Sequence, residues 1–302
     1  MTAQIQTPEQ IKNKPFFYKP FFIPPERDVF ARRAIRAAEL AEQDGGTMQA
    51  YLKLLAAVSR AQQAALDECL PQAAVPKKTG ETELPAADGE TLPPQFSGCL
   101  KTIAAQVSQD IPPAAQAALD ALLALPDEAI RAAACRLLRG ETHENEQAYR
   151  IWLAAAIQTA WTAWTVQLAD EDVPEREARV HCPCCGSEAV SNVILSGGDW
   201  DGLRYQHCAV CNSRWNALRA KCTFCGDQSA ISHERIDTDT PPVFKGARAE
   251  HCGKCGHYRK LFMLADQPHA DPVADDLASL ALDMLVAEEG SERGGYNLFL
   301  AA

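Results

Sequence analysis

Four C-x-x-C pairs constrain the fold of this chain more than any other feature of its sequence. The pairs are Cys182/Cys185, Cys208/Cys211, Cys222/Cys225 and Cys252/Cys255. Glycine follows the second cysteine in three of them, and asparagine follows it in the fourth: Gly186, Gly226, Gly256 and Asn212. These two residue types best tolerate the positive φ of a tight turn that brings two thiolates to one ion. The pattern therefore predicts eight thiolate ligands in a metal-binding region.

Eight thiolates make two tetrahedral sites, and an internal duplication indicates how they are shared. Each half of the region opens with a C-x-x-C-G pair and closes with His-Cys-x-x-Cys, at His207 and at His251. The loops between the pairs are 22 and 26 residues long. We therefore expect sequential pairing, with Cys182, Cys185, Cys208 and Cys211 in site one and Cys222, Cys225, Cys252 and Cys255 in site two. The alternative is an interleaved arrangement in which Cys211 and Cys222 share an ion.

The spacing of the cysteines does not identify the metal. Sulfur-only tetrahedral sites suit zinc, which would be structural, and also a single iron, which would be rubredoxin-like and coloured. Iron–sulfur clusters fit less well, because two symmetrical turns per ion are typical of ribbon modules. Cys184 lies inside the first turn and is expected to be a spectator thiol, with substitution for one of the ligands as the alternative. Cys69, Cys99 and Cys135 are expected to be small buried side chains on helices.

The histidines of the region do not indicate catalysis. His181, His207 and His251 each directly precede a cysteine of a C-x-x-C pair. Adjacent side chains of a strand point to opposite faces, so these imidazoles are expected to support the sites rather than bind the ion. No serine or carboxylate forms a recognisable nucleophilic arrangement with them, so no catalytic residue is predicted and the chain is not expected to be an enzyme.

Composition limits the number of domains, the classes of partner and the cellular compartment that are expected for this chain. The chain has 302 residues and a net charge of −11, which suits two or three domains and argues against a surface made for nucleic acid or anionic lipid. No apolar stretch is long enough to cross a bilayer, and the short aromatic run at 16–22 lacks the features of a signal peptide. We therefore expect a cytoplasmic protein, in whose reducing compartment paired cysteines are ligands rather than disulfides.

The organisation along the chain predicts an α+β protein. Residues 1–175 are expected to form a mainly α-helical domain, in which the proline- and threonine-rich stretch at 71–94 is a mobile connection. Two tandem rubredoxin-like or zinc-ribbon-like four-cysteine modules follow at 176–220 and 221–266. Residues 267–302 are expected to form a C-terminal helix and tail.

Two helical segments carry more detailed expectations. An aromatic and aliphatic stripe at helical spacing is expected to be core, and it consists of Trp152, Ile157, Trp161, Trp164 and Leu168. The C-terminal segment predicts one helix with Asp271 as its N-cap, Pro272 in its first turn and Gly290 past its end.

One face of this last helix is expected to pack, and the carboxylates near its start complement the helix dipole. The face consists of Val273, Leu277, Leu280, Ala281 and Met284. Asp275 and Asp276 are the carboxylates, and a structural role is the expectation for both.

Several sequence runs together resemble the formate dehydrogenase accessory proteins, the FdhE family. The runs are Cys182-Pro183-Cys184-Cys185-Gly186-Ser187, the segment 202–208, the segment 273–280 and the ending at 296–300. The resemblance is specific from His181 onward and looser over the helices. It implies a cytoplasmic assembly factor that is needed for active respiratory formate dehydrogenase and binds its catalytic subunit before export. It also implies iron at the eight paired cysteines, with zinc as a substitute.

Two other functions are compatible with paired cysteines. A zinc-ribbon nucleic-acid-binding protein is one, because eight basic residues make the cysteine region locally less acidic: Arg204, Arg214, Arg219, Lys221, Arg248, Lys254, Arg259 and Lys260. A thiol–disulfide oxidoreductase is the other, but it needs one pair at a helix start in a βαβ setting and fits poorly. We expect no nucleic-acid partner, and the sequence leaves a homo-oligomer open.

Overall fold

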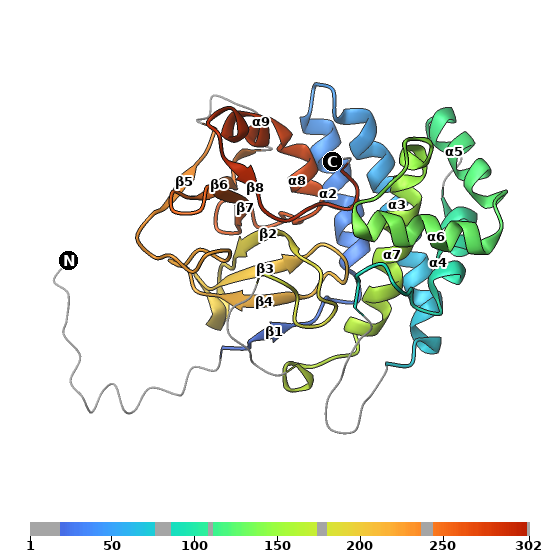
Figure 1. Ribbon diagram of the computed structural model, residues 1–302, viewed down its shortest axis with the longest axis horizontal. Helices are drawn as coiled ribbons and strands as arrows, with labels where there is room; N and C mark the ends of the chain where they lie inside the picture. The colour runs from blue at the N-terminus through green and yellow to red at the C-terminus, as the bar shows by residue number, and fades with distance from the viewer. Residues whose placement is uncertain (1–18, 76–85, 108–110, 174–179, 237–243, 301–302) are drawn as a thin grey trace.

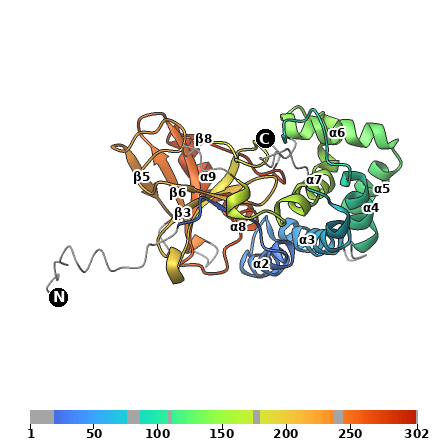
Figure 2. The same ribbon diagram turned by 90° about the horizontal axis from the view of Figure 1, so that it is seen from below.

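The fold consists of a helical lobe and a sheet lobe that lie side by side (Figures 1 and 2). The computed structural model describes residues 19–75, 86–107, 111–173, 180–236 and 244–300. Helices dominate the N-terminal half and strands dominate the cysteine-rich half, so the predicted α+β class is confirmed. None of the helices within these ranges has the length and apolar character needed to span a membrane. The centre of the predicted connection at 71–94 lies outside the described residues.

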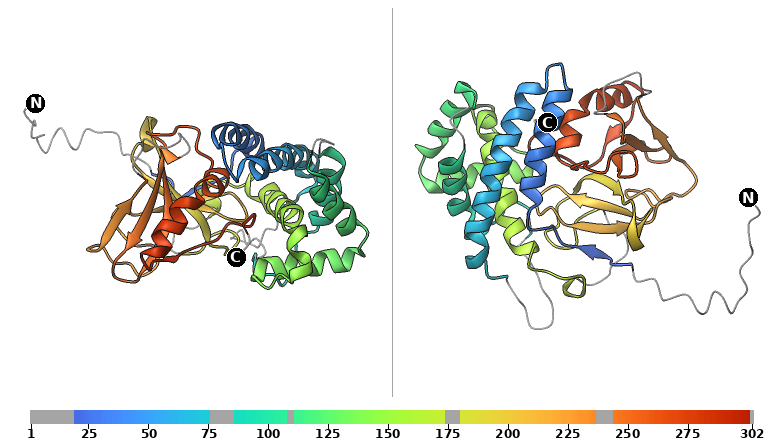
Figure 3. Two further views of the ribbon diagram at one scale, coloured as in Figure 1. Left: turned by 90° about the horizontal axis from the view of Figure 1, so that it is seen from above. Right: turned by 180° about the vertical axis from the view of Figure 1, so that it is seen from behind.

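The helical lobe contains the helices that the apolar spacing predicts. They are α2 (Val29–Gln43), α3 (Gln49–Cys69), α4 (Phe96–Gln106), α5 (Pro113–Leu123), α6 (Asp127–Arg139) and α7 (Arg150–Thr165). Proline and glycine set several of their ends: α5 begins at Pro113, and Gly140 ends α6 with a φ of 73°. Helices α2 and α3 pack against each other on one side of the lobe (Figure 3).

Helix α7 is the centre of the lobe. Every residue from Ile151 to Thr165 is buried, and Trp152 and Trp161 have no exposed surface. The rings of Trp161 and Trp164 meet edge to face, with centroids 6.5 Å apart and planes at 83°. The predicted aromatic stripe is therefore core, and the polar side chains of α7 are left to bond within the protein.

The sheet lobe is one sheet with the strand order β1-β4-β3-β2-β7-β6-β5, and β8 pairs with β7. Its strands are β1 (Phe22–Ile23), β2 (Ala189–Ile194), β3 (Arg204–Cys208), β4 (Arg214–Ala217), β5 (Ile231–Glu234), β6 (Ala247–Cys252), β7 (His257–Met263) and β8 (Glu292–Arg293).

The duplication in the sequence is visible in this sheet. In the first half, β2 follows the first cysteine pair, β3 leads into the second pair and β4 follows that pair, and β3 pairs antiparallel with both β2 and β4. In the second half, β5, β6 and β7 repeat this order around the third and fourth cysteine pairs, with the same antiparallel pairing. The halves join through parallel pairing of β2 with β7, where Asn192 faces Leu261 and Ile194 faces Met263. The predicted division at 176–220 and 221–266 stays a prediction about folding units, since both halves share one sheet.

The prediction of a single C-terminal helix is wrong. The segment forms two helices, α8 (Ala274–Ala278) and α9 (Leu280–Glu288), with a break at Ser279. The Asp271 carboxylate does accept the N–H groups of Val273 and Ala274, at 3.1 and 2.8 Å. The Ser279 hydroxyl donates to the carbonyl of Asp275 at 2.6 Å. The Ser279 hydroxyl thus occupies a carbonyl that a continuing helix would use.

The break changes which side chains of α9 are buried. Val273 and Leu277 pack as predicted, but Met284 is 67% exposed, and the buried residues of α9 are Leu282 and Val286. The predicted common face is therefore wrong beyond Ser279. Two helices that meet at Ser279 replace one continuous helix.

The acidic pair of α8 joins this segment to the rest of the protein. Asp275 pairs with Arg36 of α2 at 2.7 Å, and Asp276 pairs with Lys260 of β7 at 3.0 Å and with Arg293 of β8 at 2.8 Å. All of these except Arg293 are buried. The structural role expected for the two carboxylates is confirmed, although their partners are distant cations as well as the helix dipole.

Lys260 is expected to be important for stability, because its ammonium is buried among several acceptors. It donates to the Asp276 carbonyl at 2.6 Å and also pairs with Asp283 at 2.6 Å. Lys260→Met leaves these groups with fewer partners and should reduce the free energy of unfolding by about 3 kcal/mol. Urea unfolding measures this, with Lys245→Met at an exposed position as the control. Equal effects of the two substitutions would contradict the prediction.

Candidate metal centres

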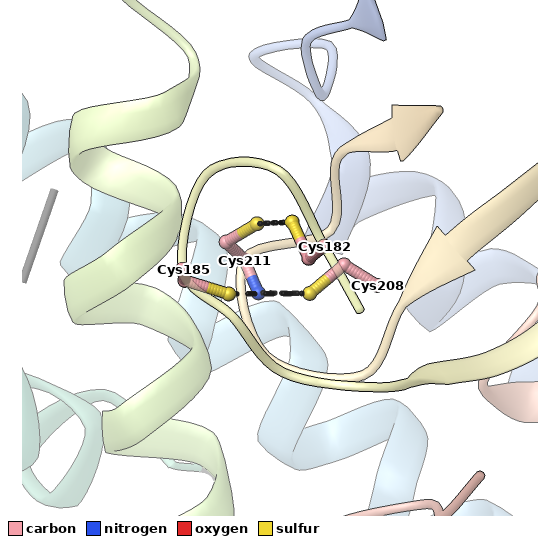
Figure 4. A group of neighbouring side chains, drawn as sticks. All are labelled: Cys182, Cys185, Cys208 and Cys211. Carbon is pink, nitrogen blue, oxygen red and sulfur yellow. Dashed lines mark hydrogen bonds between the residues drawn. The ribbon is translucent and has the colours of Figure 1, made fainter. Parts of the chain in front are cut away.

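The sulfurs of site one form a compact buried group. Cys182, Cys185, Cys208 and Cys211 each place Sγ within 4.8 Å of the other three, and all four are buried. The Sγ atoms of Cys182 and Cys211 are 3.6 Å apart, and those of Cys185 and Cys208 are 3.4 Å apart (Figure 4). Metal–sulfur bonds of about 2.3 Å in a tetrahedron separate sulfurs by about 3.8 Å. The donor set and its size therefore fit one zinc or iron ion.

Site two has the same arrangement in a more open place. The Sγ atoms of Cys222 and Cys255 are 3.8 Å apart and those of Cys225 and Cys252 are 3.7 Å apart, all within 4.8 Å. Cys225 is exposed and Cys255 is half-buried. The described cysteines thus gather in the sequential order, and Cys211 and Cys222 belong to different groups.

Local backbone geometry explains why each C-x-x-C pair turns toward a shared point. Asn212 has a φ of 57° and Gly226 a φ of 78°, the left-handed values that the sequence predicts after the second cysteine. In the Cys208 turn, the N–H groups of Val210 and Cys211 point at the Cys208 sulfur, at 3.4 and 3.3 Å. Such donors stabilise a thiolate.

The thiols of site one do not ionise alike. Burial raises the pKa of the Cys185 and Cys208 thiols well above the ordinary value, whereas at Cys182 burial is outweighed by bonds from the neighbouring thiols, which lower the pKa. Without an ion, the Cys185 and Cys208 thiols are therefore protonated at neutral pH. A coordinated thiol is deprotonated, so metal binding at this site must release protons.

The second turn of site one, at 208–211, is bonded directly to α7, which runs alongside the cysteine group in Figure 4. Gln158 donates to the Ala209 carbonyl at 2.7 Å, and Thr165 donates to the Cys211 carbonyl at 2.9 Å. The Asn212 side chain donates to the Thr162 hydroxyl at 2.9 Å. Polar side chains of α7 thus bond to the turn that carries the sulfurs of Cys208 and Cys211.

One buried guanidinium joins site one to three other parts of the chain. Arg33 of α2 is fully buried and donates to Asp271 at 2.9 Å, to Gln158 at 2.7 Å and to Asn212 at 2.7 Å. Burial opposes ionisation of Asp271, but Arg33 holds the pKa of that carboxyl below its ordinary value. The second turn, α7, α2 and the start of α8 are therefore held by a single side chain.

Sequence reasoning missed Arg33 and Arg36, although a signal was present. Both fall among the apolar positions of α2 that are buried, near Phe30, Ala37 and Leu40. An arginine at a core position requires a buried acceptor, because an unpaired buried charge is costly. Their buried carboxylate acceptors, Asp271 and Asp275, lie 238 and 239 residues away, beyond the reach of a local pattern.

His207 supports site one from outside the sulfur group, as expected. Its Nδ1 accepts a bond from Arg214 Nε at 3.5 Å, and its Nε2 lies 3.3 Å from Asn212 Oδ1. Burial and the Arg214 charge lower the pKa of His207 to about 3, so the ring is neutral at physiological pH. His181 and His251 also lie outside both sulfur groups.

The remaining cysteines take no place in either group. Cys184 lies outside site one, and its bond to Cys182 raises its pKa. Cys69 and Cys99 are buried with their sulfurs 2.8 Å apart, as expected for interior side chains. The expectation is only partly right for Cys135, which is half-buried.

Three of the eight basic residues of the cysteine region are buried. Arg204 pairs with Glu250 at 2.6 Å inside the sheet, Arg259 donates to Gln206 at 2.6 Å, and both arginines are buried. Lys260 is buried as well. The local excess of positive charge in the sequence therefore does not become an equally basic surface.

A helical lobe bonded to a sheet with two four-sulfur groups defines a class of two-centre, ribbon-like metal-binding proteins. Three family models match it in succession: "FdhE, N-terminal" over residues 18–177, "FdhE, central domain" over 181–219 and "FdhE, C-terminal domain" over 220–300. The chain belongs to the FdhE family.

Individual relatives agree over nearly the whole length. A protein FdhE homolog of Pseudomonas aeruginosa is 38% identical over 291 residues, covering 92% of this chain and 91% of that protein. A homolog of Stutzerimonas stutzeri is 34% identical and covers 100% of this chain and 98% of that protein. The crystal structure of the FdhE protein from Pseudomonas aeruginosa matches with a TM-score of 0.80 and 34% identity, covering 93% of this chain and 99% of that one.

Proposed function

We propose that this chain is a metal-binding accessory protein that assembles or activates respiratory formate dehydrogenase by binding its catalytic subunit in the cytoplasm. The observation that carries the proposal is the pair of four-sulfur groups within a full-length FdhE chain. The eight paired cysteines are its metal ligands, and iron is the metal at both sites, with zinc as the substitute.

The proposed role is not enzymatic. A tetrahedral ion bound by four thiolates has no open position for water or substrate, in contrast to a catalytic zinc with three protein ligands. The burial of all four ligands at site one also separates that ion from solvent. Both sites are therefore suited to holding structure or, with iron, an electron, rather than to activating a substrate.

A nucleic-acid-binding role is the competing function, and the internal positions of Arg204, Arg259 and Lys260 weigh against it. Retention of the purified chain on DNA or RNA at low salt, lost steeply as salt rises, would favour that role instead.

Co-purification in the native host tests the proposed function. The tagged chain is expected to retain the catalytic subunit of formate dehydrogenase from the cytoplasmic fraction, and deletion of its gene should abolish formate oxidation. Normal formate oxidation in the deletion strain, with no catalytic subunit on the tagged chain, would overturn the proposal. Metal analysis and the absorption spectrum of anaerobically purified protein decide between iron and zinc.

The difference in burial predicts that the two sites lose metal at different rates. Site two presents the exposed Cys225 sulfur to a chelator, whereas site one has no exposed ligand. With excess chelator, we expect one equivalent of metal to leave about tenfold faster than the other, or more. A chromogenic chelator measures the two phases, and Cys225→Ser should remove the fast one. A single phase releasing both equivalents would contradict the prediction.

A further inference from the structure

A cavity of about 460 Å³ lies between α2, the first strands of the sheet and the segment before α8. Its lining combines charged and apolar side chains: Glu26, Val29, Arg32, Ile35, Arg36, Glu39, His207, Arg214, Leu264, Pro268, His269, Ala270, Asp271 and Pro272. The sulfur groups contribute nothing to this lining, so the cavity is separate from both metal centres.

Within the part of the chain that the structure describes, Arg214 is the arginine of this cavity that forms no ion pair with a carboxylate. Arg32 pairs with Glu26 at 2.9 Å, and Arg36 pairs with Asp275 at 2.7 Å. Among the described residues, the recorded side-chain bond of Arg214 runs from Nε to the neutral ring of His207 at 3.5 Å. The Nη groups of a guanidinium held in this way are unused donors in the wall of a cavity.

The surroundings of Arg214 favour an added negative charge. Burial and the nearby positive charge of Arg32 lower the pKa of Arg214, and the charges of Glu26 and Asp271 offset this only in part. An anion beside the guanidinium relieves both effects, since it supplies an opposite charge and a partner for the two Nη groups. A planar carboxylate matches this fork better than a spherical anion does.

The rest of the lining limits which anion fits. Glu26, Glu39 and Asp271 are also in the wall, and they oppose any ligand with more than one negative charge. Val29, Ile35 and Leu264 supply apolar surface for a short hydrocarbon body. We propose that this cavity binds a monocarboxylate with a small apolar body and that Arg214 holds its carboxylate.

Two kinds of ligand carry such a carboxylate next to a small apolar group. The proposal depends on neither the metal nor the function proposed above. One source is a free short-chain carboxylic acid. The other is a peptide whose carboxyl end follows an apolar residue. Either carboxylate would lie beside site one, because Arg214 contacts His207, and His207 directly precedes Cys208 of that site.

Two matched ligands test the proposal on the unmodified full-length chain. Isothermal calorimetry is expected to show saturable one-to-one binding of butyrate with a Kd in about the millimolar range. Butanamide has nearly the same shape without the charge, and citrate carries several charges, so both should bind at least about tenfold more weakly. Equal affinities for butyrate and butanamide would overturn the proposal, as would tighter binding of citrate than of butyrate.

Substitution of the anchor gives a second, independent readout. Arg214→Gln should weaken butyrate binding about tenfold or more, and Arg214→Lys should weaken it less because the charge stays while the fork is lost. Arg219→Gln is the control, since Arg219 is exposed on the same module and outside the cavity. Unchanged binding in a folded Arg214→Gln variant would overturn the proposal, and the butyrate–butanamide pair decides it if that variant does not fold.

Short peptides distinguish the two sources. An acetylated Ala-Ala-Val peptide with a free carboxyl end is compared with its carboxamide and with butyrate. Tighter binding of the free-acid peptide than of butyrate supports a peptide carboxyl end as the ligand, and tighter binding of butyrate supports a free acid. Binding of the carboxamide as tight as that of the free acid contradicts both sources.

Discussion

The substitution Cys185→Ser is expected to remove the metal from site one and to lower the thermal midpoint of the protein by about 10 °C, which corresponds to roughly 5 kcal/mol at this chain length. Cys185 is fully buried and its sulfur is one of four that face a single point. Without the ion, the turn that α7 holds through Gln158 and Thr165 loses the constraint on its other side. The effect should therefore reach the contact between the two lobes.

Cys225→Ser is the matched control at site two. The same chemical change is made there at an exposed ligand, so about one metal equivalent should again be lost while the thermal midpoint falls much less. Metal content by mass spectrometry and thermal unfolding of both variants measure the difference. Equal midpoints in the two variants would show that site one does not hold the lobes together.

Removal of the Arg33 guanidinium is expected to cost about 4 kcal/mol of unfolding free energy. Arg33→Met has a similar volume but leaves the buried Asp271 carboxylate without its partner and takes a donor from Gln158 and Asn212. Breaking one side of a buried charge pair typically costs about 3–5 kcal/mol, because the other charge stays buried alone. Guanidinium unfolding measures the change.

The neighbouring residue provides the control for Arg33. Arg32 also pairs with carboxylates, Glu26 at 2.9 Å and Asp28 at 3.2 Å, but its side chain is 47% exposed. Arg32→Met should therefore change stability by less than about 1 kcal/mol. Pairing Arg33→Met with Asp271→Asn should recover part of the loss, because it removes the isolated charge. No recovery in the double variant would mean that the Arg33 bonds to Gln158 and Asn212 dominate.

Much of the candidate metal chemistry could be predicted from the sequence, because its causes are local. A cysteine turn needs a residue that tolerates positive φ, and Asn212 and Gly226 stand where that residue is required. The duplicated order of the pairs was enough to predict which sulfurs gather. Helical spacing likewise predicted that α7 would be core.

The errors of the sequence reading share one cause. A continuous helix after Asp271 ignored Lys260, whose ammonium takes the carbonyl of Asp276 where α8 ends. The burial of Arg204, which pairs with Glu250 inside the sheet, was likewise not predicted. In both cases the deciding partner comes from another strand, so no local window contains it.

The sequence alone determined the four C-x-x-C turns and the helical character of the N-terminal half, since each depends on residues within a turn or a few turns of helix. The duplicated order of the pairs predicted their grouping into two sites. Only the tertiary structure decided that the two modules share one sheet through β2 and β7, and that site one is enclosed while site two is open. The physical reason is separation along the chain. The Arg33–Asp271 bond beside site one spans 238 residues, and such a contact exists only after both lobes have packed.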